Sequence, residues 1–404
     1  MPRPLIYLDC NATTPTSPRV QAAVLAAMQQ CGNASSAHHA GRASAERIDC
    51  ARASVASLLG ACDPADVTFT SGATEANNLA VMGAIAGAKA RGLAKPHVLA
   101  GAAEHSSILA PLKRAAARGE IDFELVPVRD GGAVRVGCVE RRLRPQTVMV
   151  ALQGANNEVG SINPINEVGE LCGRRGVLLH ADLCQSFGRV PFDLANIDSA
   201  AMSAHKLYGP TGVGALYARP RVWEFLDPQT LGGGQERGRR AGTINAHAIA
   251  GFGVACDEMA ERWARGPRPE AARLRYLRDL LLARLQSGLG EIVRVNGAID
   301  PPCWDEGAAP ERLVRLVRLP HNLNVTLVGI DSAGFHADAR ERVCVSAGSA
   351  CKALGGQRSH VLEALGAPDD GAIVRVGLGA CNDAAQVEEA AGILVECARK
   401  NRVR

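Results

Sequence analysis

The sequence has few aromatic residues and no long hydrophobic run. Aromatic residues make up 3% of the 404 positions, whereas 43 positions are glycine and 47% of the residues are hydrophobic. This composition is sufficient for a sizeable core with tight turns and closely packed helices, divided between two domains. No apolar stretch approaches the length of a membrane span, and the N-terminal "MPRPLIYLDCNATTP" lacks the hydrophobic region of a signal peptide. We therefore expect a cytoplasmic protein that does not contact a membrane.

A strong charge of either sign is also missing. The 45 basic and 41 acidic side chains leave a net charge of +4, and no block of like charges stands out. Such a balance does not indicate nucleic acid as a partner.

Thirteen cysteines are present, but they do not form a metal-binding or disulfide pattern. Their number is odd, and no C-x-x-C pair occurs. We therefore predict no metal site, and we expect most of these cysteines to be small buried residues. Cys351 differs, because it lies in the glycine-containing stretch "VSAGSACKALGGQRSH" (345–360), which is neither apolar nor periodic.

Helical patterns alternate with short apolar runs over the first two thirds of the chain. This alternation predicts an α/β fold with a mostly parallel sheet in a large domain, residues 16–260. Residues 1–15 and 261–404 are expected to form a smaller α+β domain, reached through a charged helical segment at about 262–289 with a break in "GPRPE" (266–270). The apolar runs predict strands at 97–101, 123–128, 147–152, 176–181, 198–202, 292–296, 322–328, 342–347 and 373–378.

The segment "FTSGATEANNLA" (69–80) is a candidate anion site. Ala73 and Thr74 open a helical run after a strand, and the free N–H groups of a helix start bind anions. An ordinary capped helix would have the same pattern.

A second segment, "AMSAHKLYGPTGVGALY" (201–217), contains Lys206 in a context of small residues. A desolvated lysine there can act as an amine nucleophile and form a Schiff base, although most lysines in loops are simply solvated. Ser203 and His205 alternate with Ala204 and can face the same anion.

The acid of "HADLCQSFGRVP" (180–191) completes a chemical set. Asp182 ends an apolar strand and needs a cationic partner, such as a protonated pyridinium nitrogen, unless it merely caps the next helix. Gln185 can donate to a phenolate or a phosphate, and His105 in "AAEHSSI" can stack on a ring. Pyridoxal phosphate requires an anion site, an amine, an acid and a hydrogen-bond donor, and these segments provide all four.

The sequence resembles the cysteine desulfurases of the NifS/IscS type, in the class V aminotransferase superfamily of pyridoxal-phosphate fold type I. The matching segments run nearly from end to end in the family's order. They are "YLDCNATTP", "GNASSAHHAG", "FTSGATEANN", "EHSS", "GANNEVGSINPI", "HADLCQSFG", "SAHKLYGPTGVGALY", "GGGQERGRRAGT", "LNVTLVG", "SAGSAC", "SHVLEALG" and "VRVGLG".

The resemblance implies a role for each matching residue. Lys206 holds the cofactor, Asp182 pairs with its ring nitrogen, and Cys351, on a mobile loop at about 346–358, accepts the sulfur. Other implied cofactor residues are Ala73, Thr74, His105, Asn157, Gln185, Ser203 and His205. His105 is also an implied catalytic residue, and Asn157 an implied substrate-binding one. The resemblance implies that Thr243 reaches the phosphate bound in a neighbouring subunit, and therefore that the protein is a homodimer. It also implies that Arg375 binds the carboxylate of the substrate.

Some positions depart from the family's pattern. Cys10 stands where asparagine is common, and "GLGACND" (377–383) lacks the usual arginine. Lys352 and Arg358 alter the loop around Cys351, should lower the pKa of its thiol, and leave the choice of sulfur acceptor open.

We therefore predict a desulfurase that converts L-cysteine to L-alanine, leaves a persulfide on Cys351 and delivers the sulfur to an acceptor protein. The acceptor can belong to iron–sulfur cluster assembly, tRNA thiolation or a biosynthetic or DNA-modification pathway. The closest alternative is a selenocysteine lyase. A class V aminotransferase or epimerase, or a catalytically silent scaffold for sulfur trafficking, fits the residues less well.

Overall fold

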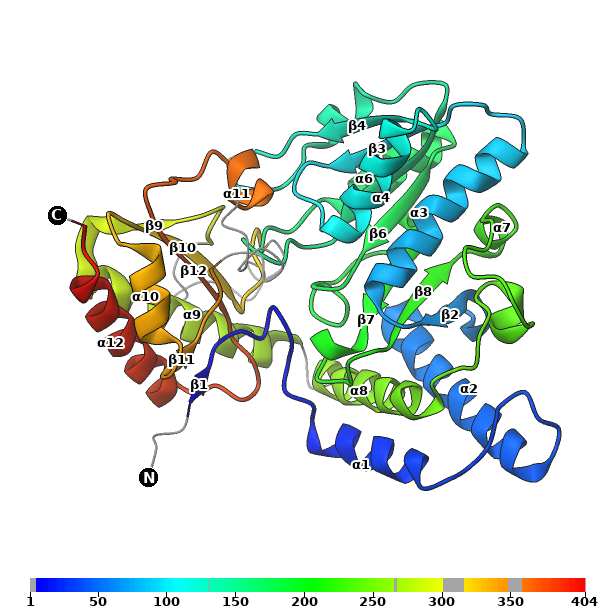
Figure 1. The fold of residues 1–404 in the computed structure, drawn as a ribbon, viewed down its shortest axis with the longest axis horizontal. Helices are drawn as coiled ribbons and strands as arrows, with labels where there is room; N and C mark the ends of the chain where they lie inside the picture. Colours follow the sequence, from blue (N-terminus) through cyan, green and yellow to red (C-terminus); the bar gives the residue numbers. More distant parts are fainter. Residues whose placement is uncertain (1–4, 130, 265–266, 301–315, 348–357, 404) are drawn as a thin grey trace.

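The structure is a computed structural model that describes residues 5–129, 131–264, 267–300, 316–347 and 358–403 (Figure 1). Two bodies lie side by side in it. The larger contains a seven-stranded sheet, and the smaller contains a three-stranded antiparallel sheet with its own helices. The two ends of the described chain both lie in the smaller body (Figure 1).

The seven-stranded sheet confirms the predicted α/β class. Its order is β2-β8-β7-β6-β5-β3-β4, and every pair from β7 to β4 is parallel, whereas β8 runs antiparallel to both of its neighbours. Five of these strands correspond to predicted ranges, β2 is the strand expected before the helical run at residue 73, and β8 was not predicted as a strand. The bounds are β2 (Val67–Thr70), β3 (His97–Gly101), β4 (Asp122–Val126), β5 (Thr147–Gln153), β6 (Leu178–Asp182), β7 (Ser199–Ser203) and β8 (Gly214–Ala218).

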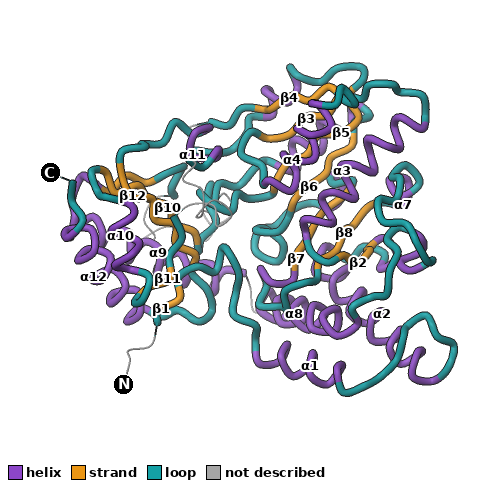
Figure 2. The backbone as a smooth tube through the Cα atoms, viewed as in Figure 1, coloured by secondary structure: helices purple, strands orange, loops and turns teal. Residues whose placement is uncertain are grey.

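Helices cover both faces of this sheet (Figure 2), which explains why most of its strands are apolar along their whole length. One hydrophobic core packs α3 (Ala73–Ala90), α4 (Ser106–Ala117) and the short α7 (Pro220–Trp223) on one face. The other core packs α2 (His39–Gly60), α6 (Ile165–Arg175) and α8 (Ala246–Ala264), with α5 (Val136–Glu140) beside α6. α1 (Pro18–Met28) lies against α8 at the edge of this layer.

Local signals explain where several helices begin and end. Ser17 accepts a hydrogen bond from the backbone of Val20 and precedes a proline at the first position of α1. α6 ends at Arg175 and is capped by Gly176, whose φ of 67° is the left-handed conformation that glycine adopts without strain. α8 ends at Ala264 and α9 begins at Pro267, so the predicted helical segment is two helices that meet near the predicted break.

The smaller body is built from both ends of the described chain. Its sheet has the order β12-β10-β9, and a separate pair places β1 parallel to β11. A core of leucine, valine and isoleucine side chains packs these strands against α9 and α12, and Ile6 and Leu8 belong to it. The bounds are β1 (Ile6–Tyr7), α9 (Pro267–Leu289), β9 (Val293–Val295), β10 (Asn322–Val328), α10 (Ser332–Ala339), β11 (Val343–Cys344), α11 (His360–Ala364), β12 (Gly371–Gly377) and α12 (Ala384–Lys400). The boundary at residue 260 stays a prediction.

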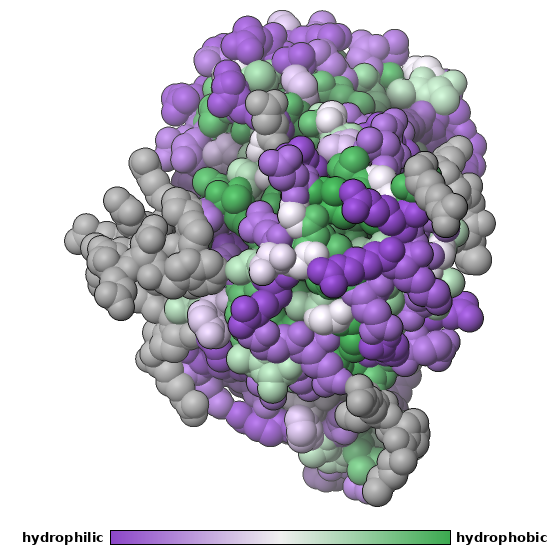
Figure 3. Space-filling view, turned by 90° about the vertical axis from the view of Figure 1, so that its left-hand side faces the viewer, coloured by the Kyte–Doolittle hydropathy of each residue, from purple (hydrophilic) through white to green (hydrophobic). Residues whose placement is uncertain are grey.

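The face presented by the smaller body is mainly hydrophilic, with hydrophobic residues between the hydrophilic ones (Figure 3). Within the described residues, no helix has both the length and the apolar character that crossing a membrane requires.

Candidate active site

A cavity of about 370 Å³ lies at the carboxyl ends of three neighbouring strands of the large sheet. β5 ends at Gln153, β6 at Asp182 and β7 at Ser203, and all three residues line this cavity, called here the Lys206 cavity. Ligands of open α/β sheets bind at this edge, because the strand ends and the loops that follow them converge there.

The N-terminus of α3 forms one wall of the Lys206 cavity. α3 begins at Ala73, and Gly72 in the N-cap position provides no side-chain cap for the first N–H groups. The first N–H groups of a helix have no partner within the helix, and its dipole places partial positive charge there. Thr74, Ser203 and His205 line the same cavity. This wall suits a phosphate.

Asp182 is the acid of the cavity. It is buried, and its Oδ2 accepts a hydrogen bond of 2.8 Å from Asn77 Nδ2, while its Oδ1 accepts one of 3.0 Å from the backbone of Cys184. Asn77 Oδ1 in turn lies 2.9 Å from His180 Nε2. These contacts orient a carboxylate that can hold a cationic ring nitrogen.

Lys206 follows β7 in a single helical turn and provides the amine. Its Nζ donates hydrogen bonds of 2.6 Å to the backbone oxygens of Asn11 and Ala12. Burial lowers the pKa of Lys206 to about 8, with a further decrease from the nearby positive charge of Arg375. At pH 7 about a tenth of this amine is therefore unprotonated, far more than for an ordinary lysine, and an amine nucleophile or base reacts in the unprotonated form.

Two histidines border the cavity. Burial and the neighbouring Lys206 lower the pKa of His205 to about 4, so its ring is neutral at physiological pH. Its Nδ1 lies 3.1 Å from the hydroxyl of Thr13. His105 forms the N-cap of α4, where its Nδ1 accepts from the backbone N–H of Ser107 at 3.1 Å.

Arg375 lies outside the set of residues that line the cavity, but its charge reaches Lys206. It sits on β12, is almost fully buried, and donates to Asp9 Oδ1 at 2.9 Å and to the Ser346 hydroxyl at 3.1 Å. A weaker contact of 3.5 Å joins it to the backbone oxygen of Asn157.

The loop "GGGQERGRRAGT" is held at two points before it reaches Thr243. Glu236 accepts hydrogen bonds of 2.7 Å from both terminal nitrogens of Arg52, and Glu75 pairs with Arg240 at 2.6 Å. Burial raises the pKa of Glu75, but the hydrogen bonds from Arg240 and Ser71 outweigh it and leave the pKa below its usual value. Thr243 itself is exposed and does not line the Lys206 cavity of its own chain.

The structure brings most of the predicted residues together. Those that line the cavity are Ala73, Thr74, His105, Asn157, Asp182, Gln185, Ser203, His205 and Lys206. Cys351 and Lys352 lie outside the described residues, so the predicted effect on that thiol stays a prediction. Arg358 binds the backbone oxygen of Ala367 and lies 3.6 Å from Asp369.

Sequence reasoning missed three supporting residues. Asn77 donates a hydrogen bond to Asp182, and Asp9 accepts one from Arg375. The backbone oxygen of Asn11 accepts one from Lys206. Asn77 sits on the buried face of α3, where a polar residue in an otherwise apolar stripe was a signal that it has a specific partner. The other two act from the N-terminal segment, and nothing local indicates their partners.

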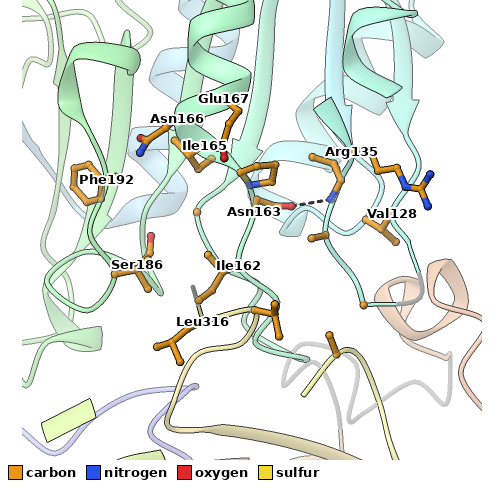
Figure 4. A pocket seen from close by; sticks show the side chains of 18 of the residues that line it. Val128, Arg135, Ile162, Asn163, Ile165, Asn166, Glu167, Ser186, Phe192 and Leu316 are labelled. Carbon is orange, nitrogen blue, oxygen red and sulfur yellow. Dashed lines mark hydrogen bonds between the residues drawn. The ribbon is translucent and has the colours of Figure 1, made fainter. Parts of the chain in front are cut away.

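A second cavity of about 1030 Å³ lies between the large sheet and the smaller body (Figure 4). Ile162, Ile165, Phe192 and Leu316 contribute apolar side chains to it, and Asn163 Oδ1 accepts a hydrogen bond of 2.9 Å from the backbone of Val134. It does not include the acid, the amine or the helix N-terminus described above, so the chemistry is assigned to the Lys206 cavity.

The Lys206 cavity fits pyridoxal 5'-phosphate. An uncapped helix N-terminus suits its phosphate, a buried carboxylate held by Asn77 suits its ring nitrogen, and an amine of lowered pKa suits its carbonyl carbon. The fold and the site together define a pyridoxal-phosphate-dependent enzyme of fold type I.

Comparisons with known proteins specify the family. The model of the aminotransferase class V family matches residues 6–296. A cysteine desulfurase of Frankia sp. (strain EuIK1) is 38% identical over 98% of this chain and 92% of its own length. Cysteine desulfurase IscS of Anaeromyxobacter dehalogenans (strain 2CP-C) is also 38% identical, over 98% of this chain and 93% of its own.

Solved structures support the same family. A NifS-like protein, 29% identical, superimposes with a TM-score of 0.83 over 97% of this chain and 99% of its own. SspA in complex with cysteine, 28% identical, gives 0.75 over 92% of this chain and 98% of its own. The chain belongs to the aminotransferase class V family, and within that family to the cysteine desulfurases.

Proposed function

We propose that this chain converts L-cysteine to L-alanine and keeps the sulfur as a persulfide on Cys351. The observation that carries this proposal is the meeting of an acid, an amine of lowered pKa and a helix N-terminus in one cavity. Pyridoxal phosphate, when bound, supplies the electron sink for bond breaking at the substrate carbons.

Each wall of the cavity has a part in holding the cofactor. Asp182 would hold the ring nitrogen, and Lys206 would hold the carbonyl carbon. The phosphate would lie against Ala73, Thr74, Ser203 and His205. The residues proposed near the ring and its phenolic oxygen are His105, Asn157 and Gln185.

Arg375 is proposed to bind the substrate carboxylate. Its Nε is buried and has no hydrogen-bond partner among the residues that the structure describes. A buried donor without a partner is costly, and a carboxylate would satisfy it with a charge-assisted hydrogen bond. Asp9 and Ser346 both accept hydrogen bonds from Nη2 of the guanidinium and so fix its orientation.

Lys206 Nζ is proposed as the group that takes and returns protons at the substrate carbons, with His105 as a second candidate. A pKa of about 8 lets Nζ exchange protons in both directions near neutral pH. Because the ring of His205 is neutral, we assign it a hydrogen-bonding role and no role in proton transfer.

Sulfur transfer is proposed to occur at Cys351. Its thiolate attacks the substrate sulfur, so a sulfur–sulfur bond forms and the carbon–sulfur bond of the substrate breaks. The electron pair of that bond stays on carbon, which takes a proton and becomes the methyl group of alanine. L-cysteine and one enzyme thiol thus become L-alanine and one enzyme persulfide.

We propose further that the protein works as a homodimer and passes the sulfur to an acceptor protein. Thr243 is exposed at the end of a loop held by Glu236 and Arg240, which suits a residue that completes the site of a second copy. SspA, which has a related fold, has been solved in complex with cysteine, and this supports cysteine as the substrate here.

The direct test is mass spectrometry after brief exposure of the cofactor-loaded enzyme to L-cysteine. We expect one additional sulfur atom on the peptide that contains Cys351 and an equal amount of alanine in solution. Alanine without an enzyme-bound sulfur, or a faster reaction with selenocysteine and no persulfide, would instead indicate a lyase.

A further inference from the structure

Two free cysteines that take no part in the proposed reaction lie next to each other. Cys10 follows β1, and Cys381 lies in the turn between β12 and α12. The backbone N–H of Cys10 donates to the backbone oxygen of Gly377 at 2.8 Å. The Cys10 sulfur lies so close to Gly379, two residues before Cys381, that a Cβ there would be 2.6 Å away. The thiols of Cys10 and Cys381 interact with each other, and the Cys381 thiol also donates to Asn382 Oδ1 at 3.8 Å.

The surroundings make the two thiols unequal. Cys10 is 1% exposed, and its hydrogen bond with Cys381 together with burial raises the pKa of its thiol well above the usual value. Cys381 is exposed, and the hydrogen bond from Cys10 lowers the pKa of its thiol to about 7, with a smaller contribution from Arg273. Cys381 is therefore more ionised at pH 7 than a thiol with an ordinary pKa near 8.5.

Arg273 is fixed beside this pair. Its terminal nitrogens donate to the backbone oxygens of Asn382 at 2.7 Å and Gly379 at 3.1 Å, and Glu270 neutralises part of its charge at 3.0 Å. On the other side, the charges of Arg189 and Asp9 act on Cys10 in opposite directions. An exposed thiolate that adjoins a buried thiol is the arrangement of an oxidisable cysteine with a resolving partner.

The pair also adjoins the segment that holds the catalytic amine. Asn11, next to Cys10, accepts hydrogen bonds through its backbone oxygen from Lys206 Nζ at 2.6 Å and from Gln185 Nε2 at 3.0 Å. Ala380, next to Cys381, donates through its backbone to the Tyr208 hydroxyl at 2.9 Å. A covalent bond between the cysteines would join two segments that both contact the neighbourhood of Lys206.

We propose that Cys10 and Cys381 form a redox-modification site, in which peroxide oxidises Cys381 and Cys10 resolves the oxidised residue. The Cys381 thiolate attacks one oxygen of hydrogen peroxide, the O–O bond breaks, hydroxide leaves, and a sulfenic acid forms on Cys381. The Cys10 thiol then attacks that sulfur, releases water and forms a Cys10–Cys381 disulfide. Two thiols are oxidised by two electrons and one peroxide is reduced to water, and an added dithiol reverses the reaction. This site is independent of the proposed desulfurase reaction.

The test uses the cofactor-loaded full chain with Cys351→Ser, so that persulfide or oxidation at the catalytic position does not confuse the readout. The protein is treated with one equivalent of hydrogen peroxide at pH 7, blocked with N-ethylmaleimide in acid, digested and analysed by mass spectrometry. We expect one linked peptide pair, Cys10 with Cys381, which disappears after dithiothreitol. Cys344→Ala, at a half-buried cysteine of β11, is the matched control and should leave this pair unchanged.

Two variants separate the roles. In Cys10→Ala, peroxide should leave a sulfenic acid on Cys381 that dimedone traps, and no disulfide. In Cys381→Ala, Cys10 should stay reduced. If Cys10→Ala does not fold, Cys10→Ser replaces it with the same expectation. Recovery of both cysteines as reduced thiols while other cysteines are oxidised, or a disulfide that joins Cys381 to another cysteine, would overturn the proposal.

Discussion

The guanidinium of Arg375 and the carboxylate of Asp9 are 2.9 Å apart, although the two residues are separated by 366 positions. Arg375 is almost fully buried, whereas Asp9 is partly exposed. The ion pair orients the proposed carboxylate-binding arginine before substrate arrives, and it lies where the N-terminal segment crosses β12.

Arg375→Lys should raise KM for L-cysteine more than it lowers kcat. A lysine keeps the positive charge but loses the planar fork that binds a carboxylate through two hydrogen bonds. Loss of one charge-assisted hydrogen bond is worth about 1.5–3 kcal/mol, or about 10-fold to 100-fold in kcat/KM. Steady-state kinetics of alanine formation measures KM and kcat, and an unchanged KM would show that Arg375 does not bind the substrate.

Asp9→Asn should destabilise the protein more than Glu388→Gln does. Asp9 compensates a buried guanidinium, whereas Glu388 pairs with Arg284 in an exposed salt bridge at 2.6 Å. Removing one partner of a buried pair leaves an uncompensated charge, while exposed pairs contribute little. Urea unfolding of both variants checks this, and equal midpoints would mean that Arg375 does not depend on Asp9.

Lys206→Met should be more stable than the wild type at pH 7 in the cofactor-free protein, and the difference should shrink as pH rises. The folded protein lowers the pKa of Lys206 from 10.5 to about 8, so the unfolded chain binds more protons between these values. Wild-type stability relative to the variant therefore increases with pH across this window, by roughly 3 kcal/mol at about 1.4 kcal/mol per pH unit. Urea unfolding at several pH values measures the slope, and a slope of zero would contradict the lowered pKa.

Cys351→Ser should bind cofactor and substrate but release essentially no alanine. A serine hydroxyl is a far poorer nucleophile toward sulfur than a thiolate, and it is not ionised near neutral pH. The absorption spectrum should still change when cysteine is added. Cys184→Ala and Cys10→Ala are the matched controls and should retain most activity under reducing conditions. Burial raises the pKa of Cys184, and the interaction with Cys381 together with burial raises that of Cys10, so both thiols stay neutral. Full turnover in Cys351→Ser would show that another residue accepts the sulfur.

Mixed dimers test the role of Thr243. Lys206→Ala and Thr243→Ala should each be nearly inactive as homodimers, since one lacks the amine and the other lacks a side chain supplied to the second copy. If Thr243 acts across the dimer, unfolding and refolding the two variants together should restore activity in the mixed dimers through one intact composite site. No recovery, with mixed dimers verified by mass, would place Thr243 in the site of its own chain.

Local sequence patterns by themselves determined much of this protein. Strands that are buried on both faces are short apolar runs, so those at 97–101 and 322–328 were predicted with the bounds that the structure has. Asp182 at the end of a strand and Thr74 in the first turn of a helix were also predicted, and both line the cavity at the carboxyl edge of the sheet.

Only the tertiary structure decided which distant residues meet. β1 pairs in parallel with β11 more than three hundred positions away, and the residues that follow β1 then meet β12 through a bridge between Asp9 and Gly377. The contact with β12 brings Asp9 to Arg375 and Cys10 to Cys381. The two-residue strand β1 is too short for a periodic pattern to identify it or its partner. Asn77 likewise reaches Asp182 only because α3 packs across the sheet. Such contacts depend on how whole elements pack against one another, and that packing is not encoded in the spacing of neighbouring residues.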